Sequence, residues 1–108
     1  MRRLVSGATD DVARLLSAEG DVDFSIRSGT RYGATVRVIR TPASPQAREL
    51  AAAEIRLAAI EAAPDRLNGV IAGAPDATAA LIRFLLQAGA VTGQLIAAAP
   101  TSPPDRKA

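Results

Sequence analysis

The chain has 108 residues, of which 48% are hydrophobic and 22% charged, the size and composition of one small globular domain. It contains neither Cys nor His, which excludes disulfides, thiolate catalysis, Cys-ligated metals and the usual base near neutral pH. The net charge of +2 is smaller than a strong nucleic-acid binder carries.

The N-terminal region predicts a short strand followed by a helix. Leu4 and Val5 are the only apolar residues available for the strand. Thr9 is a suitable N-cap, and the acidic pair that follows it suits the positive end of a helix dipole. With apolar residues at helical spacing and a glycine at position 20, we expect a helix over residues 10–19.

Alternation of apolar and polar residues predicts two strands in the next region, over residues 21–27 and 34–40. The connector between them contains two glycines, and Pro42 follows the second strand. Two alternating runs joined by a short glycine-containing connector indicate a β-hairpin.

The second half of the chain predicts two more helices. Ser44 and Pro45 are a typical N-cap and first helical residue for a helix ending near Ala63. Residues 65–69 read as a loop, residues 70–72 as a short buried strand, and residues 76–88 as a third helix. A last weak strand covers residues 94–97.

These elements predict an α+β fold with a small antiparallel or mixed sheet built around the hairpin and three helices. A β-α-β-β-α-β split unit of the ferredoxin-like type, with an added helix, is one arrangement of this order. The alternative is a hairpin-led antiparallel sheet with all helices on one face. We expect one domain over residues 1–99 and a disordered C-terminal tail over residues 100–108. No signal peptide or apolar span is evident, so a soluble, cytoplasmic protein without membrane contact is expected.

Arginines gather on the predicted hairpin and its turn. As a basic ribbon they would touch nucleic-acid phosphates, with a tyrosine ring available for stacking on a base. The alternative is a solvated outer face whose arginines pair with nearby carboxylates. The residues of this candidate nucleic-acid site are Arg27, Arg31, Tyr32, Arg37 and Arg40, with Arg2 and Arg3 in support.

The helix that begins after Ser44 has two apolar lines. We expect the line with the larger side chains, Leu50, Ala53, Leu57 and Ile60, to face inward. The second line widens the apolar face and is the candidate interface with a protein partner or a second copy of the chain. It consists of Ala51, Ile55, Ala58 and Ala62.

No catalytic, cofactor or metal motif stands out. The segment Gly69–Asp76 reads as strand, turn and helix start, but lacks the spacing of a phosphate-binding loop, and its aspartate would repel an anion. The carboxylate pairs, Asp10 with Asp11 and Asp21 with Asp23, have no third ligand nearby. We therefore expect no catalytic residues, no cofactor and no metal.

Three functions remain compatible with the sequence. The first is a non-enzymatic interaction or regulatory domain that binds another protein or itself through apolar helix faces. The second is a nucleic-acid-binding protein that uses the arginines of the hairpin. The third is a small-ligand-binding or enzymatic α/β domain in which the 69–76 turn and the carboxylates form a pocket.

Overall fold

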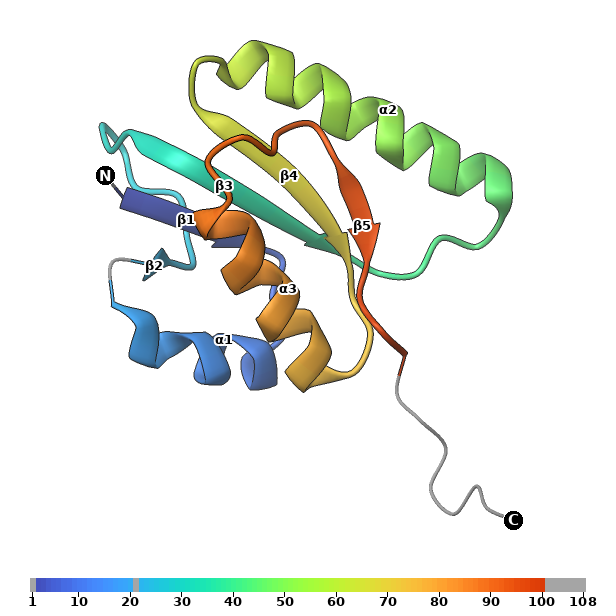
Figure 1. Cartoon of the computed structure of the whole chain (residues 1–108), viewed down its shortest axis with the longest axis horizontal. Coiled ribbons are helices and arrows are strands. Elements are labelled where there is room, and N and C mark those ends of the chain that lie inside the picture. The colour runs from blue at the N-terminus through green and yellow to red at the C-terminus, as the bar shows by residue number, and fades with distance from the viewer. Residues whose placement is uncertain (1, 21, 101–108) are drawn as a thin grey trace.

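A computed structural model describes residues 2–20 and 22–100, which form a parallel sheet with helices on both faces (Figure 1). The strands are β1 (Arg2–Ser6), β2 (Val22–Asp23), β3 (Tyr32–Ile39), β4 (Arg66–Ile71) and β5 (Leu95–Ala97). The helices are α1 (Asp10–Leu16), which continues into the 3-10 turn η1 (Ser17–Glu19), α2 (Pro45–Ala62) and α3 (Pro75–Gln87).

All pairings in the five-stranded sheet are parallel, in the order β2-β1-β3-β4-β5. The expectation of an antiparallel or mixed α+β sheet is therefore wrong, as is the ferredoxin-like split unit. The predicted hairpin strands, 21–27 and 34–40, correspond to β2 and β3, which lie on opposite sides of β1 (residue 21 is outside the described residues). They are not paired with each other: β2 pairs with β1, and β3 pairs with β1 and β4. The architecture is instead a doubly wound, Rossmann-like α/β fold.

The alternation in β3 has a cause that is independent of strand direction. Ala34, Val36 and Val38 are buried under the helices of one face, whereas Arg37 is exposed on the other face. Most strands of a parallel sheet are buried on both faces and read as continuous apolar runs. A parallel strand with one open face therefore alternates in the same way as a strand of a hairpin.

The predicted helices are confirmed. Thr9 caps α1 by accepting from the Val12 amide, and Ser44 caps α2 by accepting from the Ala47 amide at 3.0 Å. The predicted loop at 65–69 is wrong, because β4 begins at Arg66 and is buried from Leu67 onward.

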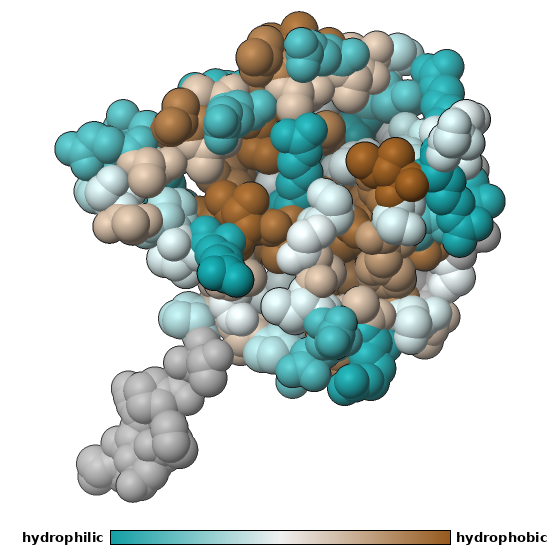
Figure 2. Space-filling model, turned by 180° about the vertical axis from the view of Figure 1, so that it is seen from behind, coloured by the Kyte–Doolittle hydropathy of each residue, from teal (hydrophilic) through white to brown (hydrophobic). Residues whose placement is uncertain are grey.

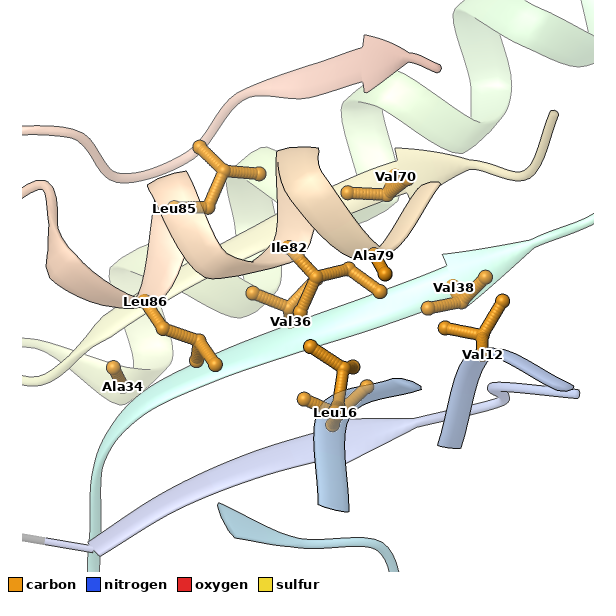
Figure 3. Close-up of a cluster of buried hydrophobic side chains, with 11 residues drawn as sticks. Val12, Leu16, Ala34, Val36, Val38, Val70, Ala79, Ile82, Leu85 and Leu86 are labelled. Carbon is orange, nitrogen blue, oxygen red and sulfur yellow. The ribbon is translucent and has the colours of Figure 1, made fainter. Parts of the chain in front are cut away.

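The larger core lies between the sheet and the pair α1 and α3 (Figure 3). Ile82 and Leu85 of α3 are fully buried and meet Val36 and Val70 from the two central strands, while α1 adds Leu16. Two helices thus share one face of the sheet, and their contact with each other closes the core.

The smaller core lies on the opposite face, between α2 and β4. Ile55 and Ala59 of α2 pack with Leu67 of β4. A Cβ added at Gly69 would lie 2.8 Å from Ile55 Cδ1 and 2.9 Å from Leu95 Cδ1. Glycine is therefore needed in the middle of β4 to let α2 and β5 approach the strand this closely.

The crossovers differ in hand. The β3–α2–β4 and β4–α3–β5 connections advance in the same direction across the sheet, but their helices lie on opposite faces. The β1–α1–β2 connection runs the other way with its helix on the face of α3, so it shares the hand of the α2 connection. The connection through α3 is the exception to the general right-handed rule. Its helix end is held by Arg66, whose guanidinium donates to the carbonyls of Leu85, Leu86 and Ala88.

Candidate functional site

A pocket of about 460 Å³ lies at the carboxyl ends of β4 and β5, beside the first turns of α2. Its lining is mixed: the strand ends contribute aliphatic side chains and main-chain atoms, and the polar side chains come from the β3–α2 connection and from α2. The lining residues are Thr41, Arg48, Ile71, Ala72, Gly73, Ala97, Ala98 and Pro100. A second hollow of about 350 Å³ adjoins it and shares Thr41 and Arg48. In open α/β sheets, ligands bind outside the carboxyl ends of the strands. We call the first of these two hollows, of about 460 Å³, the carboxyl-edge pocket.

Arg48 is the charged group of the carboxyl-edge pocket. Its side chain is exposed, and no hydrogen bond or ion pair to its guanidinium exists among the described residues. Arg40, which directly follows β3, is likewise exposed and makes no hydrogen bond or ion pair with its side chain among the described residues. A guanidinium without an internal partner beside aliphatic side chains is suited to a ligand that has an anionic group and an apolar body.

The backbone amides around the pocket are already used. Gly73 N donates to Thr78 Oγ1, Ala74 N donates to Ala99 O, and Ala98 N donates to Ile71 O, each at 2.9 Å. A Cβ at Gly73 would collide with the Ala99 carbonyl, so the segment after β5 closes over this turn. An anion in the pocket would therefore be held by side chains, Arg48 and the Thr41 hydroxyl, and not by a cradle of amides.

The strand order reverses between β1 and β3, and the crevice there is the usual place for a dinucleotide. The β1–α1 turn has a single glycine, Gly7, which adopts φ 81° and packs against the Val38 carbonyl. Thr9 occupies the Val12 amide, and Asp10 and Asp11 fill the first turn of α1. Negative side chains at this end of the helix repel a diphosphate, so these residues do not fit one.

Asp23, at the end of β2, is also occupied. It is 6% exposed and accepts from Arg2 Nη2 at 2.8 Å and Arg2 Nε at 3.1 Å. The Arg2 guanidinium holds the pKa of this carboxyl below its usual value, against the opposing effect of burial, and Arg27 lowers it further. This acid stabilises the β1–β2 edge and is not free to bind a ribose hydroxyl.

The candidate nucleic-acid residues do not form a ribbon. Arg31 pairs with Asp65 at 3.0 Å before β3 begins, and the Tyr32 hydroxyl donates to the Ser25 carbonyl at 3.4 Å. Arg37 lies in the exposed face of β3, and Arg40 lies beyond its far end. The set is therefore spread from the amino edge to the carboxyl edge of the sheet, and Arg27 sits apart in the β2–β3 connection near Asp23.

The two apolar lines of α2 are reversed relative to expectation. Ile55 is 3% exposed, and with Ala58 and Ala62 it packs toward Leu67 in the sheet, so the candidate interface line (Ala51 is also half-buried) faces the core. The line expected to face inward is exposed, with Leu50, Leu57 and Ile60 among the most exposed large apolar side chains. Both lines have helical spacing, so only the position of the sheet distinguishes them.

Sequence reasoning missed Thr41 and Arg48. Thr41 lies two residues after the end of β3, and Arg48 lies near the start of α2. Polar residues in such a strand-to-helix connection are the one signal that could have identified them. That signal has value only when the sheet is parallel, because only then do the carboxyl ends of the strands lie at one edge.

The carboxylates do not form a metal site: within residues 2–20 and 22–100, no three His, Cys, Asp or Glu side chains are placed to hold a metal. No helix in the described ranges is long and apolar enough to cross a membrane.

Comparison with known proteins agrees with the fold. The model of a family described as short chain dehydrogenase-like protein matches residues 9–98. No curated protein and no solved structure matches the chain. The match runs from the N-cap of α1 through the end of β5, so it covers all but the first strand of the sheet. The chain therefore belongs to the short chain dehydrogenase-like family.

Proposed function

We propose that the chain is a small-ligand-binding α/β domain that holds an organic anion in its carboxyl-edge pocket. The ligand would carry one carboxylate or phosphate group on a compact apolar body. The observation that carries this proposal is the exposed Arg48 guanidinium, without a partner among the described residues, at the rim of a pocket that also has aliphatic side chains in its lining.

The location and the lining of the pocket support this class of ligand. The pocket volume lies within the usual range for small-ligand sites, and such sites combine an apolar lining with a few polar groups that orient the ligand. Arg48 would bind the anion with two parallel hydrogen bonds, and Thr41 would add a third donor. The aliphatic side chains of the lining would cover the rest of the ligand.

Family membership alone would favour a nicotinamide dinucleotide, because dehydrogenases transfer hydride to or from that cofactor. The β1–α1 turn does not support it, since a tightly packed turn with Asp10 and Asp11 opposes a diphosphate. Proton transfer near neutral pH also lacks a group at the pocket: the chain contains no His or Cys, and Tyr32 lies at the other edge of the sheet. The proposal is therefore binding without hydride transfer.

The test is a thermal-shift screen followed by calorimetry. The probes are aliphatic carboxylates, sugar phosphates, nucleoside monophosphates and the oxidised and reduced nicotinamide dinucleotides. We expect stabilisation by a monoanion-bearing probe, and Arg48→Ala should weaken its binding about ten- to hundredfold, since a hydrogen bond to a charged group contributes about 1.5–3 kcal/mol.

The matched control is Arg56→Ala, which removes another exposed arginine two turns along the same helix and should leave the affinity unchanged. Binding that is unaffected by Arg48→Ala would contradict the proposed site. Stabilisation by the dinucleotides alone would contradict the proposed ligand class, and stabilisation by none of the probes would contradict the function.

A further inference from the structure

The outward side of α2 carries a continuous apolar stripe. Leu50, Leu57 and Ile60 are 62%, 58% and 73% exposed, and the exposed Ala53 lies between them. Their spacing of three, four and three residues keeps them on one side of the helix. Apolar surface appears among hydrophilic residues at the top of Figure 2, where α2 runs. We call these four residues the outer stripe of α2.

The outer stripe is more than the scattered apolar exposure of an ordinary surface. It extends over most of a helix that is about 27 Å long and that buries its opposite side in the small core. A row of aliphatic residues bordered by charges is typical of a helix that packs on another helix. The borders here are Glu49 and Arg56 on one edge and Glu54 and Glu61 on the other.

We propose that the outer stripe is the dimer interface of this chain, with α2 of one copy packed antiparallel on α2 of a second copy. In a two-fold antiparallel pair, each edge of the helix faces the same edge of its neighbour. Glu49 and Arg56 are two helical turns apart on one edge, so each Glu49 comes opposite the Arg56 of the other copy. This match occurs twice in the dimer.

The same register aligns the apolar residues. When Glu49 faces Arg56 of the second copy, Leu50 faces Leu57 of that copy and Ala53 faces its own equivalent. The small residue at the centre lets the helices approach closely, with larger side chains on either side. Neither Glu49 nor Arg56 makes a hydrogen bond or ion pair with another described residue, so both are available.

A parallel arrangement is opposed by charge. It would bring the Glu49 and Arg56 edge against the opposite edge, which carries only Glu54 and Glu61. Glu49 would then approach Glu54 of the other copy in two places, which is destabilising, and only the approach of Arg56 to Glu61 would offset it. The antiparallel pair has two Glu49–Arg56 matches and a single like-charge approach, between Glu54 of the two copies. The balance of charges therefore favours a second copy in the antiparallel orientation.

A hollow of about 390 Å³ adds to the same surface. It lies beside the C-terminal half of α2, against the loop that precedes β5, and Arg56 and Ile60 form part of its lining. The antiparallel register directs the first turns of the second copy toward this hollow. One helix pair is still a small interface, so we expect a dissociation constant on the order of micromolar.

The primary test uses the absence of cysteine from the chain. We expect Ala53→Cys to form a disulfide-linked dimer under mild oxidation, because the two Cβ atoms at the centre of an antiparallel pair come within disulfide range. Ile60→Cys should not crosslink, because residue 60 faces the other end of the second helix. Crosslinking of both variants would indicate a parallel pair, and crosslinking of neither would refute the interface.

Sedimentation of the uncrosslinked chain between 1 and 500 µM, a range set by the expected roughly micromolar affinity, gives an independent readout. Leu57→Glu should raise the dimer dissociation constant at least about tenfold while leaving the helical circular dichroism unchanged. Ile26→Glu, at another exposed apolar residue outside α2, is the matched control and should have no effect. A wild-type monomer over the whole range, or equal dimerisation by Leu57→Glu, would overturn the proposal.

Charge exchange tests the register. Glu49→Arg and Arg56→Glu should each weaken the dimer about three- to tenfold, and the double variant should restore it, because both opposed pairs are then re-formed with inverted sign. A double variant weaker than either single variant would overturn the antiparallel register.

Discussion

At the scale of single residues, β4 shows how small and polar side chains can belong to a buried strand. Asn68 is fully buried, and its polar atoms are satisfied inside the protein. Its amide nitrogen donates to the Val91 carbonyl and its oxygen accepts from the Gln94 amide, both at 3.0 Å. The side chain thereby adds to the main-chain hydrogen bonds between β4 and the segment before β5, which run from Gly93 N to Leu67 O and from Gly69 N to Gln94 O. Gly69, its neighbour, provides the space that α2 and β5 occupy.

Gly69→Ala tests the close approach. The added Cβ would lie 2.8 Å from Ile55 Cδ1, and overpacking of this kind costs about 1–3 kcal/mol of the free energy of unfolding. Gly89→Ala is the control, because its Cβ would meet no described atom within 4 Å. Urea unfolding of both variants measures the difference, and equal stabilities would show that the sheet accommodates the methyl group without strain.

Asp23→Asn tests the ion pair with Arg2. The pKa of Asp23 is lowered in the folded chain, so its contribution to stability is present above about pH 3.8 and is lost as the pH falls through the lower folded value. We expect the wild type to be more stable than Asp23→Asn at neutral pH, with the difference disappearing under acid. Thermal unfolding between pH 7 and 2.5, a range that spans the reference carboxyl pKa, measures this.

For comparison, Asp11→Asn removes an ion pair with Arg14 in which the carboxylate is 67% exposed. It should change the free energy of unfolding by less than about 1 kcal/mol at neutral pH. A pH-independent difference between Asp23→Asn and the wild type would mean that Asp23 acts through packing alone.

At the scale of elements, α2 has two apolar sides with different consequences. Its inner side holds the small core through Ile55 and Ala59, and its outer stripe is exposed. The helix covers mainly β4, with a smaller contact to β5, so the same face of β3 keeps Arg37 exposed. One helix therefore covers β4 and part of β5 on this face of the sheet.

Paired truncations on α2 separate the two sides. Ile55→Ala should cost about 2–4 kcal/mol of the free energy of unfolding, because it leaves a cavity in the small core. Leu57→Ala, on the exposed side, should cost less than about 1 kcal/mol when unfolding is measured on dilute, monomeric protein. A larger loss for Leu57→Ala would mean that the helix is turned relative to the described arrangement.

At the scale of the whole molecule, stability is concentrated in the centre of the sheet. β3 and β4 pair over six residues and β4 has helices on both faces, whereas β2 has two residues and β5 has three. The carboxyl-edge pocket lies at the ends of β4 and β5 and the outer stripe at the outer surface of α2, so the proposed ligand and partner would contact different surfaces.

Native-state hydrogen exchange tests this distribution. The amides of residues 67–71 should exchange slowest, close to the rate set by global unfolding, and those of β2 at least about tenfold faster through local opening. Peptide-level mass spectrometry at neutral pH resolves the two groups. Uniform protection across the sheet would instead indicate that the edge strands open only with the whole fold.

Local sequence signals determined the helices. Thr9, Ser44 and Pro45 mark helix starts, because caps and proline act within one turn and do not depend on the rest of the fold. The predicted strands at 4–5, 70–72 and 94–97 overlap β1, β4 and β5. The observed β1 and β4 are longer than predicted, and β5 begins one residue later. The absence of Cys and His, read directly from the chain, limits its chemistry in any fold.

Only the tertiary structure decided strand direction, the exposed side of α2 and the site. Alternation shows which face of a strand is buried and does not show the direction of its neighbours. Because β3 has one open face, its sequence pattern is the same as that of a hairpin strand. Both sides of α2 have helical spacing, and the approach permitted by Gly69 determines which of them meets the sheet. Thr41 and Arg48 meet the ends of β4 and β5 because parallel strands end at one edge, and such long-range proximity cannot be read from periodicity along the chain.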